Sequence, residues 1–250
     1  MSGLSAFLRV PTTETAARAD LVVQQLETAI AVGLLTNGER LPPESELAAE
    51  LGVSTGSLRQ ALTILRDRRI IRTRPGRNGG SVIAASAATS QQTLLEQLRA
   101  RSTEELRDLG DVCGAALGAA ARLAAARAVT AEIAGLRGLA QTLVIATDDD
   151  ACRRADSRFH IQLGVIAQSP RLTMELVQLQ GEFAPLRWMS RVGEDSDGAA
   201  CRQHLAIVEA IEQRDGQLAQ ARVIAHCEED TRLVIDAHMQ LAMTDSDGVA

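Results

Sequence analysis

Residues 40–83 carry the feature that most constrains the fold, two short amphipathic helices joined by a glycine turn. The first helix follows Pro42-Pro43 and ends at Gly52, and its apolar residues share one face. Ser54 offers a side-chain oxygen as the N-cap of the second helix, whose apolar residues also recur at helical spacing. A short helix, a turn and a capped second helix are typical of proteins that place the second helix in the major groove of DNA.

A basic wing is predicted directly after these helices. Two short strands are expected at 70–73 and 81–83, around a loop of glycine and arginine. Residues 59–77 contain seven arginines and a single acid, Asp67, although the whole chain has a formal charge of -6. Phosphate contacts act within a Debye length of about 8 Å, so an acidic protein can bind DNA through one cationic surface. The predicted DNA contacts are Ser54, Thr55, Ser57, Arg59, Arg72, Arg74 and Arg77.

The predicted fold class is mainly α, with a winged helix-turn-helix over residues 1–85 and an all-α helical bundle over residues 86–250. Residues 1–85 hold ten arginines and eight acids, whereas residues 86–250 hold sixteen arginines and twenty-four acids. Small residues at 84–90 predict a linker. One helix is expected at 14–32, and the helices of the bundle are expected at about 90–101, 103–127, 130–147, 150–168, 170–191, 198–213 and 216–241.

Composition argues against several other classes. No apolar stretch of about eighteen residues is apparent, so no membrane span is expected. The first residues lack the basic and apolar segments of a secretory signal, which predicts a cytoplasmic protein. The four cysteines are scattered without a Cys-x-x-Cys pair, so neither a zinc ribbon nor a disulfide framework is indicated.

Three histidines and one aspartate of the second domain form a candidate metal site. Asp156 and His160 are four residues apart on one predicted helix and therefore share a face. His204 and His226 lie on two further helices beside apolar residues. Each histidine taken singly is more often a surface or hydrogen-bonded core residue. Taken together, three imidazoles and a carboxylate suit a divalent transition metal, with Zn or Ni favoured.

Several segments resemble the GntR family of bacterial transcription regulators, namely residues 33–42, Glu46-Leu47-Ala48 and residues 58–62. The C-terminal helices are similar to the FCD effector domain of that family. The resemblance implies a homodimer that binds a palindromic operator in double-stranded DNA and responds to a small metabolite, an organic acid or a related compound. It also implies that Asp156, His160, His204 and His226 bind the metal.

Four positions depart from the pattern of that family. Ser45 and Thr55 stand where the DNA-reading part usually carries arginines. Cys113 and Leu117 stand where the sensor often carries an arginine and a glutamate. These changes predict an altered operator sequence, and they remove a charge-assisted partner that a carboxylate effector would otherwise use.

Two functional hypotheses follow. The favoured hypothesis is a ligand-responsive transcription regulator. The alternative is a metal-dependent hydrolase that uses the three histidines and Asp156, with the N-terminal domain serving to localise it. The sequence offers no candidate general base beside the metal site, which weighs against the hydrolase.

Overall fold

The computed structural model describes residues 15–76, 80–84, 91–145, 149–190 and 196–247 of the 250-residue chain. The chain separates into two compact units, Met1–Thr89 and Ser90–Ala250. Most of the predicted linker and the predicted DNA contact Arg77 lie outside the described residues.

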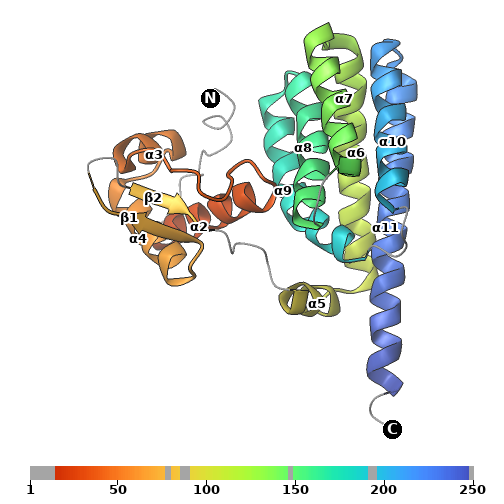
Figure 1. Ribbon diagram of the computed structural model, residues 1–250. Helices are drawn as coiled ribbons and strands as arrows, with labels where there is room; N and C mark the ends of the chain where they lie inside the picture. Colours follow the sequence, from red (N-terminus) through yellow and green to blue (C-terminus); the bar gives the residue numbers. More distant parts are fainter. Residues whose placement is uncertain (1–14, 77–79, 85–90, 146–148, 191–195, 248–250) are drawn as a thin grey trace. The chain divides into compact units, whose positions relative to one another are not determined.

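The first unit is a winged helix-turn-helix, as the sequence predicted. Its helices are α2 (Thr15–Ala31), α3 (Glu44–Leu51) and α4 (Thr55–Asp67), and its strands are β1 (Ile71–Arg74) and β2 (Gly80–Ile83) (Figure 1). The strands are antiparallel with Ile71 opposite Ile83. The backbone of residues 38–41 also bonds to β2, for example from the Leu41 N–H to the Ser81 carbonyl. Both strands are displaced by one residue from their expected positions at one or both ends.

Local signals set the turn between the two central helices. Gly52 has a φ of 69°, and its N–H bonds to carbonyls of the last turn of α3. This left-handed conformation favours glycine and ends the helix. The Ser54 hydroxyl accepts a hydrogen bond from the Ser57 N–H at 3.1 Å and thereby caps α4. The predictions that Gly52 ends the first of these helices and that Ser54 caps the second are confirmed.

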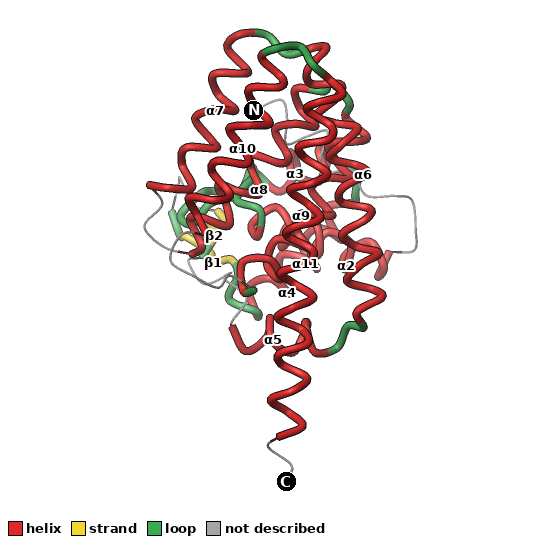
Figure 2. Tube along the Cα trace, turned by 90° about the vertical axis from the view of Figure 1, so that its right-hand side faces the viewer, coloured by secondary structure: helices red, strands yellow, loops and turns green. Residues whose placement is uncertain are grey.

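The second unit is built of helices alone within its described residues, and the strands are confined to the first unit (Figure 2). It contains α5 (Gln91–Arg99), α6 (Thr103–Arg127), α7 (Thr130–Ile145), α8 (Asp149–Ile166), α9 (Pro170–Met189), α10 (Ser196–Glu212) and α11 (Gly216–Asp247). Most ends lie within two residues of the prediction. The exception is α11, which continues six residues beyond residue 241. The apolar periodicity of the sequence fades after residue 241, but no glycine that could end the helix occurs before residue 248.

The central helix α6 passes the length and composition test for a membrane span, contrary to the expectation from the sequence. An 18-residue window within it has a mean hydropathy of 1.3. However, 56% of that window is buried within the protein, where α6 packs against α8, α9, α10 and α11. Core helices of soluble proteins pass the same test, so this feature is weak evidence for a membrane.

Glycines on α6 allow α11 to approach closely. An added Cβ at Gly110 would lie 2.1 Å from the Thr231 hydroxyl oxygen, and one at Gly118 would lie 3.1 Å from the Ile224 side chain. Gly114 lies between them, facing Cys227. The spacing of four residues places all three glycines on one face of α6. This packing holds the middle of α11 against the centre of the bundle, and α11 carries His226.

Candidate DNA interface and metal centre

The exposed face of α4 carries part of the predicted DNA contact set. Thr55 and Arg59 are exposed there, and Gln60 and Thr63 share this exposure. The opposite side of α4 is buried through Leu58, Ala61, Leu62 and Leu65. Gln60 and Thr63 were not among the predicted contacts, although the helical period that buries the leucines also exposes these two residues.

Two of the predicted contacts on α4 have roles within the protein. Ser57 is only 1% exposed, so the expectation that its side chain contacts DNA does not fit its position. Its hydroxyl lies 3.0 Å from that of Ser54, and both belong to the helix cap. Arg59 donates a hydrogen bond from Nε to Glu44 Oε2 at 2.7 Å. Because both partners are exposed, this ion pair is weak and leaves the guanidinium available to a phosphate or a base.

The wing presents further arginines to solvent. Arg72 and Arg74 lie on β1, and both are exposed, whereas Ile71 is buried. Arg66 and Arg68 lie near the end of α4, but Arg68 bonds to Glu27 of α2 at 2.7 Å. The described arginines of β1 therefore form the basic surface of the wing.

The four predicted metal ligands come together in the second unit. Asp156 and His160 lie on α8, His204 lies on α10 and His226 lies on α11. One donor atom from each residue lies within 4.8 Å of the donors of the other three, and all four residues are buried. His204 Nε2 is 3.2 Å from His226 Nε2 and 3.5 Å from Asp156 Oδ1. His160 Nδ1 is 3.7 Å from Asp156 Oδ2.

The chemical state of the cluster suits a metal ion. Burial lowers the pKa of His160, although Asp156 opposes the shift. Burial also lowers the pKa of His204 well below its usual value, and His226, His160 and Arg187 reinforce that shift. Both rings are therefore neutral near pH 7, the form in which an imidazole binds a metal. Within the described residues, both ring nitrogens of His160 are buried without a hydrogen-bond partner.

Neighbouring side chains hold the rings in place. The Phe159 ring stacks on the His204 ring with centroids 3.9 Å apart and planes 6° apart. His226 Nδ1 lies 2.7 Å from Gln203 Oε1. The Trp188 indole N–H donates to Asp156 Oδ2 at 3.3 Å. Such contacts orient the groups that coordinate an ion.

A buried ion pair beside the cluster was not anticipated from the sequence. Arg187 of α9 donates from Nε to Asp230 Oδ1 of α11, and both side chains are at most 7% exposed. Burial disfavours the guanidinium charge, but Asp230, together with Asp156 and Glu229, outweighs this effect and raises the pKa of Arg187. The i,i+4 spacing of His226 and Asp230 was visible in the sequence. No local pattern links Arg187 to either residue.

The two positions that depart from the family pattern in the sensor are both buried in α6. Burial, assisted by Glu182 and Glu175, raises the pKa of the Cys113 thiol to about 12, so this side chain is neutral near pH 7. Leu117 belongs to the main hydrophobic cluster. Neither residue can supply charge to a ligand.

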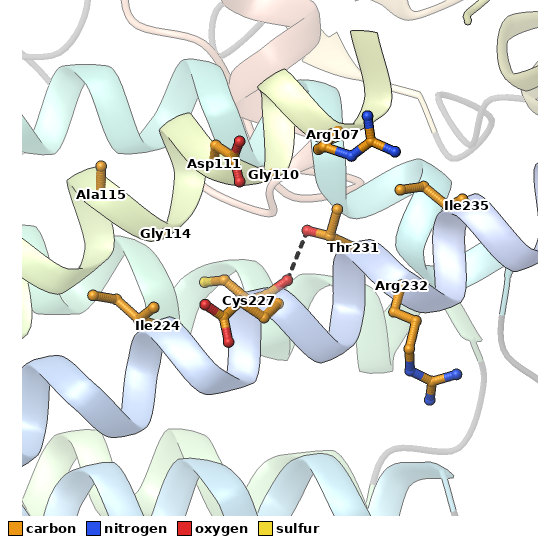
Figure 3. A pocket seen from close by; sticks show the side chains of 11 residues that line it. Arg107, Gly110, Asp111, Gly114, Ala115, Ile224, Cys227, Thr231, Arg232 and Ile235 are labelled. Carbon is orange, nitrogen blue, oxygen red and sulfur yellow. Dashed lines mark hydrogen bonds between the residues drawn. The ribbon is translucent and has the colours of Figure 1, made fainter. Parts of the chain in front are cut away.

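An open groove of about 480 Å³ runs along the contact between α6 and α11 (Figure 3). Its floor contains Gly110, Gly114 and Thr231, and the Thr231 hydroxyl donates to the Cys227 carbonyl at 2.7 Å. Charged residues of both signs line its edges, namely Arg107, Asp111, Glu228 and Arg232.

Comparison with known proteins gives matches in both units. Residues 18–79 match the model of bacterial regulatory proteins, gntR family, and residues 117–229 match the FCD domain. The chain is 38% identical over 231 residues to a Mycobacterium gastri protein named as an HTH-type transcriptional regulator, RmpR, covering 92% of this chain and 84% of that protein.

Two further relatives have names that state a direction of regulation. The Glc operon transcriptional activator of Escherichia coli strain K12 is 28% identical over 218 residues, covering 83% of this chain and 85% of that protein. The HTH-type transcriptional repressor NanR of Salmonella newport is 26% identical over 222 residues, covering 83% of this chain and 81% of that protein. The matched families and these relatives are transcription regulators and not enzymes, which removes the support for the hydrolase alternative.

Proposed function

We propose, from the premise that this chain belongs to the GntR family of bacterial transcription regulators and carries an FCD domain, that it binds a palindromic operator as a homodimer and responds to a small metabolite. The metabolite, an organic acid or a related compound, binds at or near a divalent metal ion in the second unit. The observation that carries this proposal is the convergence of four buried donor residues from three helices.

The DNA-reading part of the proposal rests on exposed residues of α4 and the wing. Thr55, Arg59 and Gln60 lie on the exposed face of α4, which a winged helix-turn-helix directs to base edges. Arg72 and Arg74 of β1 supply sequence-independent contacts to phosphates. A two-fold symmetric dimer presents two such surfaces, and therefore reads a palindrome.

The metal part rests on the fit between the donors and an ion. Three imidazoles and one carboxylate are a donor set for Zn or Ni, and neither buried ring nitrogen of His160 has a hydrogen-bond partner within the described chain. A bound ion would supply open coordination positions for the oxygens of a metabolite. Because the donors come from α8, α10 and α11, a ligand at this centre acts on the relative packing of these helices.

The α6–α11 groove is the surface that we assign to the second copy of the chain. Each helix carries an arginine and a carboxylate one turn apart, Arg107 with Asp111 and Arg232 with Glu228. A copy related by a two-fold axis presents the same pattern, so arginines can face carboxylates across the interface. A second copy that covers the groove would also bury apolar surface of α6 that is exposed in the single chain.

The proposal is tested by DNA binding with and without metal in a panel of organic acids. Metal-stripped protein and the His204→Ala variant should keep their fold and most of their operator binding but lose the response to the acid. A ligand shifts the DNA-bound population only by its difference in affinity for the two states, so loss of the ligand site abolishes the shift. His238→Ala is the matched control, because His238 lies outside the cluster and bonds to the Leu98 carbonyl. A full acid response in His204→Ala would contradict the proposal.

A further inference from the structure

A second buried carboxylate lies beside the metal cluster. Asp230 is 4% exposed and follows His226 by one helical turn on α11. On α8 the order is reversed, with Asp156 one turn before His160. We propose that Asp230 is a fifth protein ligand of the ion, an inference that rests on the proposed metal-dependent function.

The distance from Asp230 to His226 supports a shared ion. Asp230 Oδ2 is 3.4 Å from His226 Nε2. The neighbouring pair of nitrogens, His226 Nε2 and His204 Nε2, is 3.2 Å apart. Ligands that each lie about 2.0–2.2 Å from one ion are separated by roughly 3.0–3.5 Å when they are adjacent. The pair of Asp230 and His226 therefore has the same spacing as the pair of imidazoles.

A hydrogen bond at Nδ1 of the His226 ring leaves Nε2 as the atom that faces Asp230. His226 Nδ1 is 2.7 Å from Gln203 Oε1, and an amide oxygen only accepts. With Nδ1 as the donor, as in an imidazole that binds a metal through its other nitrogen, the Nε2 lone pair and the Asp230 carboxylate lie side by side. A cation shared between them would stabilise both groups.

Arg187 holds the other oxygen of the same carboxylate. Its Nε donates to Asp230 Oδ1, which leaves Oδ2 directed at His226. Carboxylates that bind metals commonly accept a hydrogen bond, and this bond orients them. Arg187 thus acts as a positioning residue for Asp230, and its Nη1 stays buried without a hydrogen-bond partner among the described residues.

The additional ligand changes what the site can accept. Asp230 lies one residue beyond the segment that matches the FCD domain, so this carboxylate is not part of the matched pattern. The net charge of a site with two carboxylates, a divalent ion and the Arg187 guanidinium would be +1. With five protein donors, a bound ion would have fewer positions left for a metabolite than with four, which would favour a metabolite that binds through a single anionic oxygen.

Titration of the metal-stripped full chain with Co²⁺ tests the assignment. The Asp230→Asn variant keeps the shape and can still accept from Arg187, but it loses the charge at the ion. We expect at least about tenfold weaker Co²⁺ binding together with altered intensity of the d–d absorption bands at saturation. Asp236→Asn is the control, since Asp236 is exposed on the same helix and pairs with Arg232. Its affinity and spectrum should match those of the unmodified chain.

The absorption spectrum separates a ligand from a residue that only orients other ligands. Unchanged bands in Asp230→Asn overturn the assignment whether or not the affinity falls. If Asp230→Asn fails to fold, the double variant Arg187→Met/Asp230→Asn removes the buried charge together with its partner and is judged by the same two measurements. Failure of the unmodified chain to bind Co²⁺ would instead refute the proposed metal centre itself.

Discussion

Replacement of Gly110 by alanine should destabilise the second unit, although the same change usually stabilises a helix. Alanine is favoured over glycine by about 1 kcal/mol in a helix interior. At Gly110, however, the new Cβ would lie 2.1 Å from Thr231 Oγ1 and 2.6 Å from Thr231 Cγ2. Thr231 has little freedom to move, because it is β-branched and its hydroxyl bonds to the Cys227 carbonyl. Overpacking of this kind costs about 1–3 kcal/mol.

We take the overpacking cost near the upper end of that range and subtract the gain of about 1 kcal/mol in helix propensity. We therefore expect a net loss of about 2 kcal/mol in the free energy of unfolding. For a unit of this size, such a loss lowers the melting temperature by about 4–8 °C. Thermal and urea unfolding would measure both quantities. The variant should also bind metal more weakly, because Thr231 lies five residues from His226 on α11.

Gly138→Ala is the matched control. Gly138 lies in α7, is exposed, and an added Cβ there would meet nothing within 4 Å. This substitution should raise the free energy of unfolding by up to about 1 kcal/mol. In the Gly110→Ala background, Thr231→Ala should recover most of the lost stability. Stabilisation by Gly110→Ala equal to that of Gly138→Ala would refute the close packing of α6 on α11.

Three further outcomes are expected. Arg74→Ala should weaken binding to all DNA sequences and reduce the salt slope by about one unit, as seen in fluorescence titrations, whereas Arg171→Ala on the second unit should leave the slope unchanged. Metal-free protein should lose stability as the pH falls below about 6.5, because the unfolded chain takes up protons that burial denies to His160 and His204. Urea titrations that give equal stability at pH 7.5 and 5.5 would contradict this. The chain should scatter light as a dimer of about 53 kDa, twice its mass of 26.6 kDa. Ala115→Arg in the groove should shift it towards monomer and Ala126→Arg should not, and a stable monomer that binds its operator intact would disprove the dimer.

The helix-turn-helix and the helix boundaries were predictable from the sequence because their signals are local. Gly52 adopts a left-handed conformation that most other residues avoid, and Ser54 bonds to a backbone group three residues away. The same holds for Asp156 and His160, whose spacing places them on one helix face whatever surrounds that helix. Such features depend on neighbouring residues alone.

The composition of the site depended on contacts between distant helices. The sequence predicted which histidines could share an ion, and its spacing places Asp230 one turn after His226, but it did not predict that Arg187 of another helix pairs with Asp230. Likewise, Ser57 was a plausible DNA contact by its position in the helix, yet the rotation of α4 against its neighbours buries it. The rotation of a helix and the partner of a buried charge are decided by how whole faces pack, since each placement must satisfy many contacts at once. No short segment of sequence contains that information, so only the tertiary structure could supply it.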